Sequence, residues 1–369
     1  MIAHPLLCCC LYLFLPFAST LAVPAAKSAA GTVQPQTLNG CYIYRPTTPP
    51  RACAFFLGGA FVGAAPQLAY GALCQRLADS GYVVLAAPFK LQFDYLELCD
   101  TVLSTAEPAH AALVEEYGEL PLVGVGHSCG ALLHVLLSSA FRGTGGLADI
   151  ERVANVLISF NNKPAQSAIP FFGELVAPAT SSILRLENDP LLQPWRQAVA
   201  ESQKRLDDLV SSASSSGGAA AAAIEEARQV LPVLEQIEPI LREIDSGKIE
   251  FSPTPEEARR SAAKLYDAKR TLVLRFLDDS LDESPPLPAV LQRATGDVTL
   301  QSLQGTHLTP LTPSGPDQPP LLPLPPLPLP TTLPSNALAS LAGARQEDFE
   351  AATSLLLEFL DESLTSSKK

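Results

Sequence analysis

Positive charge is scarce in this sequence. Its 25 Lys and Arg residues stand against 38 Asp and Glu residues, and the formal net charge at pH 7 is −13. Binding the phosphates of a nucleic acid requires clustered Lys and Arg side chains, and the sequence has no such cluster. The composition therefore argues against a nucleic-acid partner, and solubility is the simpler reason for the acidity.

Cys-x-x-Cys pairs are also missing. Three of the eight cysteines fall at residues 8–10, inside an apolar N-terminal run. The others are odd in number and irregularly spaced: Cys41, Cys53, Cys74, Cys99 and Cys129. This pattern argues against a disulfide framework and against a zinc or other metal site, and it favours a reducing compartment.

Charged side chains are scarce in the N-terminal region. No Lys or Arg precedes the apolar run at residues 6–17, and no acidic residue occurs before Asp79. Small residues at 18–22 offer a processing site, so we interpret residues 1–31 as a targeting leader. An acid-free stretch with Ala, Ser and Pro suits a plastid or chloroplast leader, while the secretory pathway and a membrane anchor stay open as alternatives.

Short apolar runs alternate with segments of helical periodicity. Strands are predicted at residues 41–45, 52–57, 82–87, 120–125, 153–160, 271–276 and 298–303. Helices are predicted between them at residues 66–80, 94–117 and 129–141. This order predicts an α/β protein with a mostly parallel central sheet and helices on both faces.

The chain divides into six predicted segments. They are the leader at 1–31, the first part of the core at 32–161, a helical insertion at 162–269, the second part of the core at 270–309, a proline-rich linker at 310–336 and a C-terminal helix at 337–369. The insertion follows the carboxyl end of a strand, where a cap would cover a site; a helical bulge without substrate contact is the alternative. Proline at the density of the linker excludes helix and central strand, so we interpret it as an extended tether.

Residues 126–130, Gly-His-Ser-Cys-Gly, join a predicted strand to a predicted helix. In a G-x-S-x-G segment of this kind a sharp turn exposes the serine, and the glycines let neighbouring backbone pass close by. The N-terminus of the following helix and the N–H of Cys129 would face a developing oxyanion. We therefore predict that Ser128 is a nucleophile.

A serine nucleophile needs a general base and a carboxylate, in the chain order Ser, Asp, His. His307 follows the last predicted strand and is the only histidine beyond residue 134. Asp279 follows the strand at 271–276 and is our first choice of acid, with Asp282 second and Asp278 third. A solvated turn is the alternative role for these carboxylates.

Residues 57–63, Leu-Gly-Gly-Ala-Phe-Val-Gly, follow an early strand and are similar to the oxyanion loop of lipases and esterases. The N–H groups of Gly59 and Ala60 are candidate oxyanion donors together with Cys129. No Lys-Ser or Lys-Thr follows, which argues against a nucleotide-binding loop, and we expect no cofactor.

Two further pairs of residues are candidates for substrate contact. Asn161 and Asn162 end a predicted strand on the face where the triad opens, and turn formation is the alternative. Phe171 and Phe172 begin the insertion and suit a lipid-like acyl group, with packing inside the cap as the alternative.

Seven segments together resemble one family: residues 58–67, 126–130, 159–163, 169–170, 252–256, 276–284 and 305–307. It is the uncharacterised plant, algal and cyanobacterial family of domain of unknown function 1350, within the α/β-hydrolase superfamily. The resemblance covers most of residues 40–311. It implies an α/β-hydrolase fold and a plastid location, and it implies no established substrate.

These residues predict a serine hydrolase that cleaves a small-molecule or lipid ester or thioester through an acyl-enzyme. Peripheral association with a membrane is compatible with a lipid substrate. Two alternatives stay open: a non-catalytic scaffold or assembly factor of the same fold in the plastid, and an acyltransferase.

Overall fold

A computed structural model describes residues 35–168, 200, 204, 235–313 and 345–366 of the chain. The predicted leader, most of the predicted insertion and most of the proline-rich linker lie outside the described residues. Phe171 and Phe172 lie outside them too. None of the helices in the described ranges is both long and apolar enough to span a bilayer.

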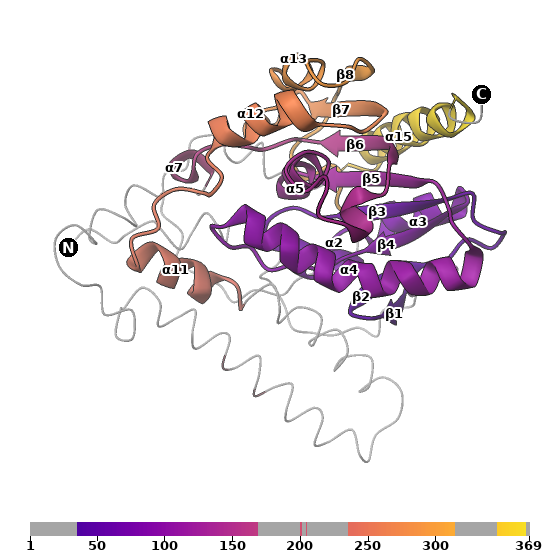
Figure 1. Ribbon diagram of the computed structural model, residues 1–369, viewed down its shortest axis with the longest axis horizontal. Coiled ribbons are helices and arrows are strands. Elements are labelled where there is room, and N and C mark those ends of the chain that lie inside the picture. The colour runs from indigo at the N-terminus through magenta and orange to yellow at the C-terminus, as the bar shows by residue number, and fades with distance from the viewer. Residues whose placement is uncertain (1–34, 169–199, 201–203, 205–234, 314–344, 367–369) are drawn as a thin grey trace.

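An eight-stranded sheet organises the fold (Figure 1). Its spatial order is β1 (Gln36–Leu38), β2 (Cys41–Tyr44), β4 (Tyr82–Ala86), β3 (Ala52–Leu57), β5 (Leu122–His127), β6 (Arg152–Ile158), β7 (Arg270–Phe276) and β8 (Val298–Leu303). The pairs β1–β2 and β2–β4 are antiparallel, and all later pairs are parallel. The prediction of a mostly parallel α/β sheet is confirmed, while β1 was not predicted.

Helices cover both faces of this sheet (Figure 1). One face buries α4 (Tyr95–Tyr117), α5 (Cys129–Leu137), α6 (Gly146–Asp149), α12 (Pro255–Leu265) and α13 (Leu287–Leu291). The other face buries α3 (Gly71–Asp79) and α15 (Gln346–Ser366). Because both faces are covered, every residue of the central strands β3, β4, β5 and β6 is buried, which explains their almost continuous apolar sequence.

The helix predicted at 66–80 is divided in the structure. A short 3₁₀ turn η2 (Val62–Ala64) is followed by α2 (Pro66–Ala69) and then α3. The break falls at Tyr70, whose backbone φ and ψ of −123° and 16° are not helical. Its side chain is fully buried, so the break turns a large polar aromatic ring toward the core beneath the sheet edge that carries Ser128.

Helix α15 closes the second face of the sheet. Phe349, Leu356 and Leu360 are buried among the strands and α3. Ion pairs at its rim join Arg51 to Asp361 and Arg76 to Glu350. These pairs are solvent-exposed and contribute little, so burial of the apolar stripe holds the helix in place.

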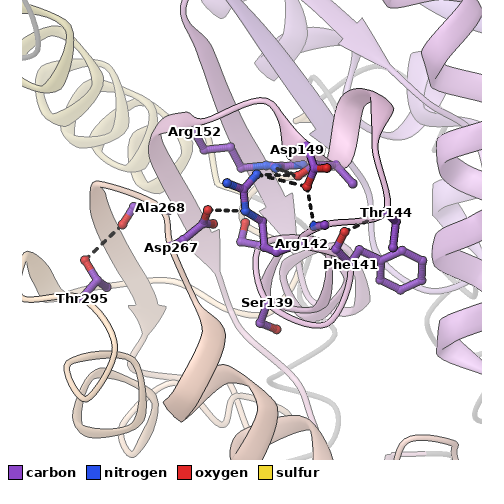
Figure 2. A network of polar contacts seen from close by, with 12 residues as sticks. Ser139, Phe141, Arg142, Thr144, Asp149, Arg152, Asp267, Ala268 and Thr295 are labelled. Carbon is purple, nitrogen blue, oxygen red and sulfur yellow. Dashed lines mark hydrogen bonds and ion pairs between the residues drawn. The ribbon is translucent and has the colours of Figure 1, made fainter.

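A polar network joins the amino ends of β6 and β7 to the end of α5 (Figure 2). Arg142 pairs with Asp267 and lies 3.6 Å from the carboxylate of Asp149. Arg152, the first residue of β6, is 1% exposed beside them, and burial lowers the pKa of its guanidinium to about 10. Since Ser128 follows the carboxyl end of β5, this network lies at the opposite edge of the sheet and serves the fold.

Two described pieces of the predicted insertion come before α12. They are α7 (Ala165–Ala168), directly after the turn that ends β6, and α11 (Ile237–Asp245). Helix α12 begins with a capping box between Thr254 and Glu257, and its Ala258 and Ala262 are buried in the core. This last helix of the predicted insertion therefore packs with the sheet.

Candidate active site

Ser128 lies in the sharp turn between β5 and α5. Its φ of 55° and ψ of −115° place a non-glycine residue in a strained region of backbone space. Its N–H donates to the carbonyl of Ile158 at 2.9 Å, which ties the turn to the neighbouring strand. The strain is therefore held by the sheet.

The two glycines of the motif are required by close backbone contacts. A Cβ atom added at Gly126 would lie 2.5 Å from the carbonyl oxygen of Gly130. One added at Gly130 would overlap the carbonyl oxygens of Leu57 and Gly58. The start of α5 thus packs directly against the loop after β3, which brings that loop to Ser128.

Ser128, His307 and Asp279 form one hydrogen-bonded row. The Nε2 atom of His307 lies 3.0 Å from Ser128 Oγ, and its Nδ1 atom lies 2.8 Å from Asp279 Oδ2. All three residues are buried, and the Asp279 side chain is 0% exposed. The structure brings together the serine, the histidine and the first-choice acid that the sequence selected.

The carboxylate of Asp279 is held in its ionised form. Burial raises its pKa, but the charge of His307 and hydrogen bonds from His307 and the Leu281 N–H outweigh burial and leave the pKa below its ordinary value. An ionised carboxylate accepts a proton-bearing Nδ1, so Nε2 of His307 is left to accept the Ser128 hydroxyl proton. This is the tautomer that base catalysis requires.

The two other candidate acids have different surroundings. Asp278 is exposed, and its N–H donates to the carbonyl of Gly305 at 3.0 Å. The Asp282 side chain is 2% exposed and lies 3.6 Å from Arg275 Nε, and burial raises the pKa of its carboxyl. Only Asp279 among the three candidates hydrogen-bonds to His307 in the described structure.

The loop after β3 requires a correction to the predicted oxyanion donors. The N–H of Gly59 donates to the hydroxyl of Tyr70 at 2.7 Å, inside the core. This bond occupies the Gly59 amide, so Gly59 shapes the loop instead of facing an oxyanion. Ala60 and Cys129, the first residue of α5, are left as candidates. Burial raises the pKa of the Cys129 thiol to about 12, so we consider only the backbone N–H of Cys129 as a donor to the oxyanion.

The strand order, the strained serine turn and the row of three side chains are those of an α/β-hydrolase fold. The sequence model of one protein family, described as "Protein of unknown function (DUF1350)", matches residues 34–202 and 217–315, more than half of the chain. The chain belongs to this family. No curated protein matches it.

Several solved structures are similar to this DUF1350 chain. One is a lipase in its open form, at 14% identity and a TM-score of 0.44, covering 88% of this chain and 94% of that one. Est1E from Butyrivibrio proteoclasticus is 12% identical with a TM-score of 0.43, covering 91% and 100%. A thioesterase domain from the curacin biosynthetic pathway is 15% identical with a TM-score of 0.40, covering 75% and 94%.

Sequence reasoning missed the contact between Tyr70 and His127 behind the site. Tyr70 Oη lies 2.8 Å from His127 Nδ1, and the His127 ring lies 4.8 Å from that of His307. Burial, followed by the charge of His307, holds the pKa of His127 well below its ordinary value, so its ring is neutral. The motif marked His127 only as the neighbour of the serine, and no pattern in the sequence pointed to Tyr70.

The two asparagines predicted to contact substrate hydrogen-bond to other parts of the protein. Asn162 is 4% exposed, and its Nδ2 donates to the carbonyl of Pro255 at 3.0 Å. The Oδ1 of Asn161 accepts from the Lys163 N–H at 3.1 Å. The Asn161 bond matches the alternative of turn formation, whereas the Asn162 bond joins the segment after β6 to Pro255, the first residue of α12.

Proposed function

We propose that this chain hydrolyses a carboxylic ester or thioester through an acyl-enzyme on Ser128. The proposal rests on one observation above the others: a strained serine lies 3.0 Å from His307 Nε2, while Asp279 holds the other ring nitrogen at 2.8 Å. A serine hydroxyl is a poor nucleophile at neutral pH and needs a base in this position.

In the first step the Ser128 oxygen forms a bond to the carbonyl carbon, and its proton moves to His307 Nε2. The tetrahedral intermediate then breaks its bond to the alcohol or thiol, which leaves with the proton from His307. Water repeats these steps on the acyl-enzyme, releasing the acid and restoring Ser128. Asp279 holds His307 in the tautomer with the proton on Nδ1 and stabilises the imidazolium, while its own carboxylate stays ionised.

The negative charge on the tetrahedral oxygen needs donors that are in place beforehand. We assign this role to the N–H groups of Ala60 and Cys129, aided by the N-terminus of α5. Support comes from the direct packing of Gly130 against the carbonyls of Leu57 and Gly58, which brings the two loops together.

We propose a lipid-like or otherwise apolar acyl group for the substrate and a plastid location for the protein. The apolar sequence at residues 169–172 supports the first, and the acid-free leader supports the second. A fluorescent protein fused after the leader, imaged in an algal cell, tests the location: a signal in secretory membranes contradicts it.

The test of the activity is labelling by a fluorophosphonate probe, with the modified residue found by mass spectrometry. Wild-type protein is expected to react at Ser128, and Ser128→Ala and His307→Ala are expected not to react. Folded wild-type protein that takes no label contradicts the proposal and favours the scaffold alternative. Addition of butanol to an ester assay separates hydrolysis from acyl transfer, since a transferase would form the butyl ester in preference to the acid.

A further inference from the structure

The side chain of Gln236 joins two loops at the candidate site. It is 1% exposed and precedes α11. Its Nε2 atom donates to the carbonyl of Phe61 at 2.8 Å, and its Oε1 atom accepts from the N–H of Leu91 at 2.8 Å. Phe61 belongs to the loop after β3 and Leu91 to the loop after β4, so one amide group satisfies a backbone acceptor and a backbone donor on separate loops.

The carbonyl that Gln236 binds belongs to a strained turn. Phe61 has a φ of 62° and a ψ of −61°, and the N–H of Val62 donates to the carbonyl of Ala60 at 2.7 Å. This is a γ-turn with positive φ at its central residue, a form that non-glycine residues adopt rarely and only when their surroundings hold it. Ala60, the candidate oxyanion donor, is the first residue of that turn.

Segment 235–245 is anchored to the molecule by contacts besides Gln236. Ile240 and Ile244 are 5% and 4% exposed within the core on the same face as α4. The Oε2 atom of Glu243 accepts from the N–H of Phe93 at 2.9 Å. Gln236 therefore projects from a docked segment, and its bond to Phe61 links that segment to the oxyanion loop.

We propose that Gln236 is a positioning residue for the oxyanion hole: its bond to the Phe61 carbonyl holds the γ-turn that aims the Ala60 N–H. This inference rests on the proposed serine hydrolase function. Without the amide, the Leu91 N–H loses its bond to Gln236, and the Phe61 carbonyl keeps only the longer bond from the Ala64 N–H at 3.1 Å. Each loop recovers the lost bond only by moving toward water. Movement of the first loop carries the Ala60 N–H away from the developing charge.

The test compares Gln236→Met with Glu243→Ala. Methionine keeps the length and apolar volume of the side chain but neither hydrogen bond, and Glu243→Ala removes a backbone contact of the same segment without touching the oxyanion loop. Steady-state hydrolysis of p-nitrophenyl butyrate and the rate of fluorophosphonate labelling at Ser128 are measured on the full chain, with thermal unfolding as a check of folding.

We expect Gln236→Met to lower kcat by about tenfold or more with KM within about threefold, because donors to the oxyanion act on the transition state. Labelling should slow in parallel, and Glu243→Ala should change both rates by less than about threefold. Should the Met variant fail to fold, Gln236→Asn, which retains the amide on a shorter side chain, replaces it with the same expected loss.

The outcomes separate the two proposals. Wild-type protein that neither labels at Ser128 nor hydrolyses the ester contradicts the proposed function itself. An active wild type whose Gln236 variants match Glu243→Ala in kcat overturns only the role of Gln236, as does a change confined to KM.

Discussion

The Nε2 atom of His307 lies 3.0 Å from the Oγ atom of Ser128, although 179 positions separate the two residues in the chain. The contact forms because parallel strands place all their carboxyl ends at one edge of the sheet. Ser128 follows β5, Asp279 follows β7 and His307 follows β8, so three distant loops converge on one point.

Replacement of Asp279 by Asn should lower kcat/KM for a p-nitrophenyl ester by about 10³- to 10⁴-fold, because an amide no longer fixes the tautomer of His307. Asp278→Asn is the matched control, since Asp278 is exposed one position earlier in the same turn. It should stay within about threefold of wild type. Equal losses in both variants would falsify the assignment of Asp279 as the acid.

Asp282→Asn should change the dependence of stability on pH. Burial raises the pKa of the Asp282 carboxyl in the folded state, so its favourable contribution is complete below the unfolded pKa and is lost as pH rises through the folded pKa. The melting temperature of Asp282→Asn minus that of wild type should therefore increase as pH rises from about 4 to 7. A difference that stays constant across calorimetric scans in this range contradicts the prediction.

Tyr70→Phe should destabilise the fold by about 1–3 kcal/mol, because the buried N–H of Gly59 loses its acceptor. Tyr44→Phe is a matched control: the Tyr44 hydroxyl is also buried and has no hydrogen-bond partner among the described residues. Its removal should be neutral or slightly stabilising. Urea unfolding of both variants gives the comparison, and equal effects would show that the Gly59 bond contributes nothing.

Gly126→Ala should cost about 1–3 kcal/mol or prevent folding, because its methyl group meets the backbone of Gly130. Gly296→Ala is the control, since nothing lies within 4 Å of the added atom there. Guanidinium unfolding monitored by circular dichroism measures both. An unchanged free energy of unfolding for Gly126→Ala would contradict the close contact between Gly126 and the backbone of Gly130.

Much of the fold was predictable from local patterns. Strands β3 and β4 are apolar throughout, and β5 is apolar as far as His127, because all three are buried on both faces; that signal is visible without any partner strand. β1 was missed because its three residues are mostly exposed and gain their conformation by pairing with β2. The prediction of one continuous helix at 66–80 was wrong, since packing of the Tyr70 ring overrides the helical periodicity of its neighbours.

Some parts of the candidate site were also predictable from local sequence, and others were not. The spacing of residues 126–130 and the order of Ser128, an acid and His307 along the chain are local facts, and they were sufficient to name the serine and the histidine. The choice of Asp279 over its neighbours depends on the direction of side chains in one turn. The role of Gly59 depends on Tyr70, and that of Gln236 on a docked segment far along the chain.

The sequence by itself determined the α/β order of elements, the glycine-flanked serine and the histidine that follows the last strand. Periodicity and short motifs carry that information because they reflect bonds between near neighbours. Only the tertiary structure decided which carboxylate meets His307, which amides are already bonded and which distant side chain holds the loop beside Ser128. Those outcomes depend on hydrogen bonds between residues far apart in the chain. Their geometry is set only when the strands pair and the loops at the carboxyl edge of the sheet pack together.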